Sequence, residues 1–69
     1  MSQDHIEEAK KKVEEIMSKV EKGRIVVIAG VKVRTIDIVP SRRSVKIVIN
    51  DGEKAYYPSE FVKLKVVEY

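Results

Sequence analysis

The sequence predicts a small α+β domain, in which one amphipathic helix is followed by several short antiparallel strands. Residues 4–22 contain neither Gly nor Pro and place an apolar residue every three or four positions, which is typical of a helix with one buried face. From residue 24 onward β-branched residues alternate with charged ones, and Gly, Pro and Asn-Asp-Gly interrupt them. Because the chain has only 69 residues, both parts are expected to form one domain, 1–69.

The helix is expected to span about residues 4–22. Asp4 is its predicted N-cap, and Glu7 completes a capping box; Ser2 is the alternative N-cap. Gly23 suits the left-handed position that ends many helices. The apolar stripe predicts packing on the chain's own sheet, with a coiled-coil dimer as the alternative. The stripe consists of Ile6, Ala9, Val13, Ile16, Met17 and Val20, and the i,i+4 pairs expected beside it are Glu7–Lys11, Glu8–Lys12 and Glu15–Lys19.

Five strands joined by tight turns are expected after the helix. Ala29-Gly30 and Pro40-Ser41-Arg42-Arg43 are predicted turns, and Asn50-Asp51-Gly52 is the strongest hairpin signal. In the second strand the apolar phase slips by one residue near Arg34-Thr35, which predicts a β-bulge or a sharp bend. Five short strands of this kind predict a five-stranded antiparallel barrel with the helix over one opening. The expected strands are residues 24–29, 31–39, 44–50, 53–57 and 62–68.

The segment Tyr56-Tyr57-Pro58-Ser59-Glu60-Phe61-Val62-Lys63-Leu64 resembles the closing motif of SH3 domains, Y-[IF]-P-S-[NE]-[YF]-V-x-L. The resemblance covers nine residues of 69 and implies an SH3-like barrel, in which a short 3₁₀ turn follows the Pro. It also implies a groove for proline-rich peptides, for which the matching positions are Pro58 and Phe61, with Tyr56 as a third candidate. The chain has no Trp and no Ala-Leu-Tyr-Asp-Tyr-like segment, which supply most of that family's peptide contacts. An Sm-like barrel, which also begins with a helix, is the alternative architecture.

Catalytic and metal-binding residues are not expected. The chain has no Cys, and its single His, His5, falls in the first helical turn, so neither a nucleophile–base pair nor a metal-ligand cluster is predicted. We therefore expect no enzymatic activity, no cofactor and no metal. No stretch reaches the roughly 20 apolar residues of a membrane span, and no signal peptide is recognised, so a soluble cytoplasmic protein is expected.

Positive charge is concentrated in the strand region. The formal net charge is +3, and residues 23–69 carry nine Lys or Arg against five acidic residues. If apolar strand residues such as Ala55 face the core, the cations face outward, with Tyr56 and Tyr69 as candidates for base stacking. Outward lysines also keep strand edges soluble, which is the alternative interpretation. The candidate nucleic-acid-binding residues are Lys32, Arg34, Arg42, Arg43, Lys46, Lys54, Tyr56, Lys63 and Lys65.

Three functions are compatible with these observations. The regular helix caps, opposed charges and β-branched strands resemble a de novo designed protein, which implies a thermostable scaffold without evolved activity; a hyperthermophile protein has a similar composition. The second function is a small nucleic-acid-binding module that uses the basic surface. The third is a peptide-interaction module of SH3-like type that uses Tyr56, Pro58 and Phe61. A monomer or a weak homodimer is expected, because a strand edge or the helix stripe could pair with a second copy.

Overall fold

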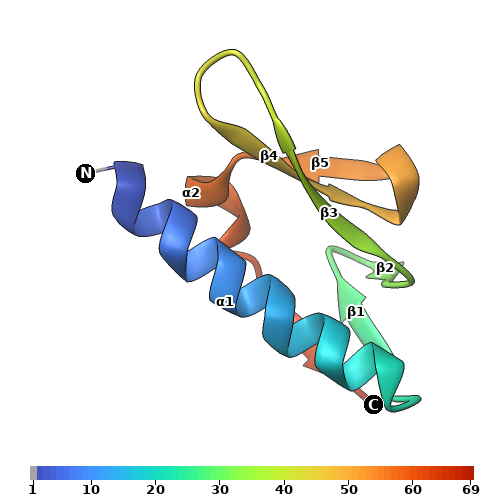
Figure 1. Ribbon diagram of the computed structural model, residues 1–69. Helices are drawn as coiled ribbons and strands as arrows, with labels where there is room; N and C mark the ends of the chain where they lie inside the picture. Colours follow the sequence, from blue (N-terminus) through green and yellow to red (C-terminus); the bar gives the residue numbers. More distant parts are fainter. Residues whose placement is uncertain (1) are drawn as a thin grey trace.

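A computed structural model describes the backbone of residues 2–69 and the side chains from His5 onward. The strands form two antiparallel three-stranded sheets, β2-β1-β6 and β3-β4-β5, and the predicted α+β class is confirmed (Figure 1). No helix in this part of the chain is long and apolar enough to cross a membrane. The elements are α1 (Ser2–Glu21), β1 (Val26–Ile28), β2 (Val31–Lys32), β3 (Ile36–Pro40), β4 (Val45–Ile49), the 3₁₀ turn η1 (Asn50–Gly52), β5 (Lys54–Tyr56), the short helix α2 (Pro58–Phe61) and β6 (Val66–Glu68).

The predicted strand 31–39 is bent, and its two halves belong to different sheets. β2 pairs with β1, whereas β3 pairs with β4, and the break between them at residues 33–35 lies where the phase slip predicts a bulge or bend. The five expected strands therefore become six. The strand pairs of residues 2–69 form two separate sheets rather than one closed barrel, so closure of a five-stranded barrel stays a prediction.

The side chain of Asn50 holds this bend in place. It is only 7% exposed, and its Oδ1 accepts hydrogen bonds from the backbone N–H groups of Arg34 (2.7 Å) and Thr35 (3.2 Å). Its Nδ2 donates to the carbonyl of Lys32 (2.8 Å) and to Glu53 Oε1 (3.0 Å). All four hydrogen bonds that an amide side chain can readily make are thus present, and three of them satisfy backbone groups where the strand is interrupted.

The turn between β4 and β5 is longer than the two residues left between the expected strands 44–50 and 53–57. The longer turn changes the register, so each side chain of β5 lies on the opposite side of the sheet from the expected one. Ile49 pairs with Lys54, so four residues lie between the strands. Ile47 pairs with Tyr56, which therefore packs against the core, whereas Ala55 is exposed. The expectation that Ala55 faces inward and Tyr56 outward is wrong, because a register change of one residue moves every side chain to the other side of the sheet.

The turn between β1 and β2 is formed as predicted. Ile28 pairs with Val31, and the two residues between them have positive φ angles, 50° at Ala29 and 77° at Gly30. Two left-handed residues in succession are the signature of a type I′ hairpin turn. Gly adopts this conformation freely, whereas Ala29 adopts it at a steric cost.

Helix α1 covers the core with the predicted apolar stripe. Ala9, Val13 and Ile16 are buried together with residues of both sheets, and Met17 and Val20 pack against them. The stripe is therefore used within the domain, as expected. The helix begins at Ser2, so Asp4 lies inside its first turn instead of preceding it as an N-cap; the side chains of residues 2–4 lie outside the described part.

The end of α1 carries the predicted glycine cap. Gly23 has φ +88°, its N–H donates to the carbonyl of Val20 (3.0 Å), and the N–H of Arg24 donates to the carbonyl of Lys19 (3.0 Å). These two bonds form a Schellman motif, which satisfies carbonyls that the helix leaves without a partner.

Lys12 joins α1 to the segment between α2 and β6. Its ammonium donates to the carbonyls of Phe61 (3.1 Å), Val62 (3.3 Å) and Leu64 (2.7 Å), and it lies 5.4 Å from the centroid of the Phe61 ring. Burial lowers the pKa of this ammonium from its ordinary value. The contacts also explain why the predicted strand 62–68 shortens to β6, because the carbonyls of Val62 and Leu64 accept hydrogen bonds from Lys12 and not from a neighbouring strand.

Candidate nucleic-acid interface

The predicted cations do not converge on one surface. They lie on different elements, and the β3–β4 hairpin that carries some of them projects from the rest of the domain (Figure 1). Their places are the outer side of sheet β2-β1-β6 (Lys32, Arg34, Lys65), the β3–β4 hairpin (Arg42, Arg43, Lys46), the start of β5 (Lys54) and the turn after α2 (Lys63).

The outer side of sheet β2-β1-β6 carries exposed apolar residues beside cations. The first and third residues of β1 are fully buried, so alternation directs Ile25 and Val27 to the opposite side. Val67 pairs with Val27, and the N–H of Tyr69 donates to the carbonyl of Ile25 (2.8 Å), so both share that side. We call this surface the β1 face. It consists of Ile25, Val27, Lys32, Lys65, Val67 and Tyr69.

Cations border the β1 face at two of its edges. Lys32 is exposed and pairs with Val27, so it flanks the centre of the face from β2. Lys65 directly precedes Val66, whose side chain packs against the core, and alternation directs Lys65 outward. Arg34 follows at the bend beyond β2 and is also exposed. The face is therefore positively charged.

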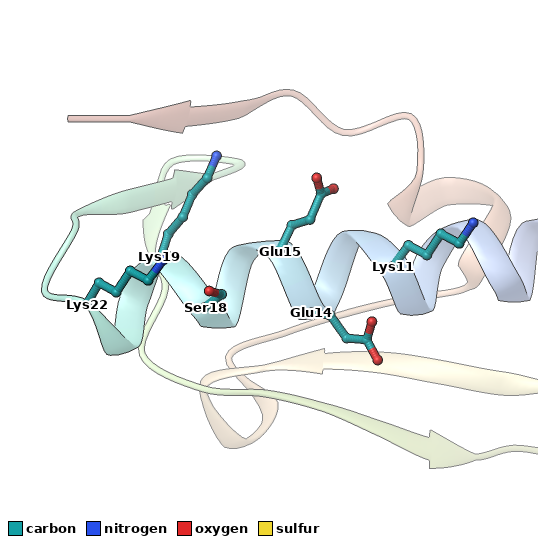
Figure 2. Close-up of a pocket in the computed structure, with 6 residues that line it drawn as sticks. All are labelled: Lys11, Glu14, Glu15, Ser18, Lys19 and Lys22. Atoms are coloured by element: carbon teal, nitrogen blue, oxygen red, sulfur yellow. The ribbon is translucent and has the colours of Figure 1, made fainter.

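The one acidic residue of these three strands, Glu68, is engaged on the opposite side. It pairs with the buried Val26, and its carboxylate lies 3.0 Å from Lys19 Nζ and 2.8 Å from Arg24 Nη1. The hydrogen bond from Lys19 and the charges of Lys19 and Arg24 lower the pKa of Glu68, against a smaller opposing effect of desolvation. Figure 2 shows Lys19 extending from α1 toward the C-terminal strand, where its ammonium contacts Glu68 and not the expected partner one turn earlier, Glu15.

The apolar residues of the β1 face are exposed or half-buried. Tyr69 is 75% exposed and Ile25 is 44% exposed. Val27 and Val67 are half-buried, yet they are not among the residues that pack on the core. Of these four residues, sequence analysis identifies only Tyr69, as a candidate for base stacking. The others are not identified because a continuous apolar segment such as 25–28 predicts a strand covered on both sides.

The other predicted aromatic and hairpin residues are less available for base stacking. Tyr56 packs against the core. On the outer side of the second sheet, the half-buried Lys46 places its ammonium 5.3 Å from the centroid of the Tyr57 ring and occupies one side of that ring. Arg42 and Arg43 are exposed in the β3–β4 loop, and Arg43 lines one hollow together with Tyr57.

The predicted peptide groove is not assembled from the expected residues. Phe61 is fully buried in the core and Tyr56 packs against the core, because both point inward from α2 and β5. Pro58 is buried but borders an open hollow of about 450 Å³ next to Tyr57. The hollow is also lined by His5, Arg43, Ser44, Ser59 and Glu60.

The described residues contain no arrangement that resembles a catalytic or metal centre. His5 Nδ1 lies 3.8 Å from Glu8 Oε1, one turn along the same helix, and no group of three potential metal ligands occurs among residues of the described part. The hollow along α1 in Figure 2 is lined by five residues of that helix and by Lys22, which directly follows it, with both signs of charge. It has no second wall that could enclose a substrate.

Comparison of the chain with protein-family models, with curated proteins and with solved structures found no match. We therefore infer function from the geometry of the β1 face and from the chemistry of its residues.

Proposed function

We propose that this chain is a non-enzymatic binding domain whose β1 face contacts the phosphates of a nucleic acid. The observation that carries the proposal is the one-sided charge of that face. Lys32 and Lys65 border it, and Arg34 lies beside it. On the opposite side, Glu68 is held by Lys19 and Arg24. Cations that are not neutralised by neighbouring carboxylates gain most from contact with phosphates, because binding releases the counterions of the nucleic acid.

At the level of fold, we propose that the two sheets are an open form of an SH3-like small barrel. The support is the strand order: β1 pairs with the last strand, the bent segment β2–β3 contributes to both sheets, and the one-turn helix α2 lies between β5 and β6. Small barrels of related design expose a sheet surface that binds oligonucleotides. The competing proposal, a designed scaffold without a ligand, is supported by the close agreement of caps and turns with local sequence rules.

The experiment that tests the proposal is fluorescence anisotropy with labelled single-stranded and duplex oligonucleotides at low and at physiological salt. The double variant Lys32→Glu/Lys65→Glu is expected to weaken binding at least about tenfold. For a single strand, it should also reduce the slope of log affinity against log salt by about 0.7 for each lost phosphate contact.

The matched control is Lys54→Glu/Lys63→Glu, which changes net charge by the same amount on two cations outside the β1 face. Its affinity should stay within about threefold of wild type at physiological salt, where the Debye length is about 8 Å. Equal losses in both double variants would contradict a localised site. Absence of binding at low salt would reject a nucleic-acid function and favour the scaffold.

A second candidate function is peptide binding at the hollow beside Pro58. Its walls come from the β3–β4 loop and the start of α2, and they include Tyr57 and Arg43. Ser44 Oγ is shielded from solvent and has no hydrogen-bond partner in the described residues, so a polar ligand group could satisfy it. A library of proline-rich and acidic peptides, screened against wild type and Tyr57→Ala, tests this function. Binding that is unaffected by Tyr57→Ala would reject it.

A further inference from the structure

We infer that the β1 face selects single-stranded over duplex nucleic acid by stacking unpaired bases on the strip formed by Ile25, Val27, Val67 and Tyr69. This inference rests on the proposed function and names the class of nucleic acid that the face takes. Lys32 flanks the strip from β2, and Lys65 lies at one end of it, two residues before Val67. An aromatic and apolar surface bordered by cations is the combination that single-strand-binding proteins use, because bases stack on the surface while phosphates contact the charges.

Tyr69 is the central stacking residue of the strip. Its side chain is 75% exposed, while its backbone N–H is fixed to the carbonyl of Ile25 at 2.8 Å. The backbone of residue 69 is thus held at a defined place on the sheet, and its ring is open to solvent. Tyr57, another exposed tyrosine, lies under the ammonium of Lys46, so one side of its ring is already occupied.

The spacing of the strip suits bases that are spread apart. The Ile25–Tyr69 pair and the Val27–Val67 pair are two residues apart along the strands, about 6.6 Å at the usual rise per residue. That distance is about twice the 3.4 Å step between stacked nucleotides of a duplex strand. In a duplex the faces of the bases are also hidden in the stack, so the apolar strip would gain nothing from it.

A second copy of the chain is a poorer occupant of the same surface. If two β1 faces packed together, each copy would bring Lys32 and Lys65 toward the like charges of the other, and neither face contributes a carboxylate side chain to pair with them. Like charges brought together in this way oppose association. The charge of the face therefore favours an anionic ligand over self-association.

The inference is tested by comparing three ligands of equal length at one salt concentration: oligothymidine, a chain of abasic nucleotides with the same number of phosphates, and a duplex. Wild type is expected to bind oligothymidine about 5- to 100-fold more tightly than the abasic chain. Tyr69→Ala should remove most of this preference, whereas Tyr69→Phe should keep it within about threefold, because the ring is retained. The salt dependence should be the same in all three proteins, since no cation is changed.

The possible failures are distinguishable. Salt-dependent binding with equal affinity for oligothymidine, abasic chain and duplex would overturn base stacking while leaving phosphate binding intact. If wild type shows no salt-dependent binding to any of the three ligands, the proposed function itself is overturned. Sedimentation of the protein alone as a dimer, abolished by Tyr69→Ala and unaffected by oligothymidine, would overturn the inference in favour of a second copy.

Discussion

Replacement of Asn50 by Ala is expected to destabilise the domain by about 4 kcal/mol. Three backbone groups at the bend, the N–H groups of Arg34 and Thr35 and the carbonyl of Lys32, would lose their partner. Each is partly buried, so the low end of the cost of an unsatisfied group applies, about 1 kcal/mol each. Residue 50 has a φ angle of +54°, which Asn tolerates but Ala adopts at a steric cost of about 1 kcal/mol, and this cost adds to the loss. The bond to Glu53 adds nothing to this estimate, since its exposed carboxylate can bind water.

The assay is urea unfolding followed by circular dichroism, with two matched variants. Asn50→Gly loses the same side-chain bonds but tolerates positive φ, and it should be less destabilised than Asn50→Ala by about 0.5–1 kcal/mol. Asp51→Ala has the same left-handed backbone (φ +59°) without buried side-chain bonds, and it should cost no more than about 1 kcal/mol. A loss below about 1 kcal/mol in Asn50→Ala would refute the role of Asn50 at the bend.

Three further changes test other contacts. Lys12→Met should lower the free energy of unfolding by about 2 kcal/mol, because three carbonyls lose a charged donor, whereas the exposed Lys11→Met should change it by less than about 0.5 kcal/mol in the same urea assay. Ala29→Asn should raise the free energy of unfolding by about 0.5–1 kcal/mol, because Asn tolerates φ +50° and Asn-Gly suits a type I′ turn; a lower midpoint would contradict that turn. Glu68→Gln should be less stable than wild type above pH 4.5, the ordinary pKa of Glu. Because the pKa of Glu68 is lowered in the folded state, the difference in stability between the two proteins should disappear as the pH falls through the folded-state pKa. A difference in stability that is independent of pH would contradict the ion pairs of Glu68 with Lys19 and Arg24.

Features that depend on neighbouring residues were predictable from the sequence. The stripe of α1, its glycine cap at Gly23 and the Ala29-Gly30 turn follow from local spacing and backbone preference, and the structure contains all three. The bend near Arg34-Thr35 was predictable because a phase slip leaves few other solutions.

Features that depend on distant contacts were not predictable in the same way. The role of Asn50 requires the backbone of residues 32–35, and that of Lys12 requires the carbonyls that follow α2. Without the length of the β4–β5 turn, the register that buries Tyr56 could not be chosen. The cations of the candidate site were recognisable, but their distribution over separate elements depends on strand order.

The β1 face shows why an apolar strand is ambiguous in a sequence. The segment 25–28 has the composition of a strand covered on both sides, whereas in the structure Ile25 and Val27 face outward. An exposed apolar strip of this kind on a small domain is a candidate interaction surface, since single-domain proteins seldom leave such strips without a use.

The most direct test of the central claim is a titration of the ¹⁵N-labelled protein with oligothymidine, followed by ¹H–¹⁵N correlation spectra. The largest shift changes are expected on the amides of β1, β2 and residues 65–69, while those of the β3–β4 hairpin and α1 should change little. Changes centred on the hairpin, or small changes spread evenly over all cationic segments, would contradict the assignment of the β1 face as the binding surface.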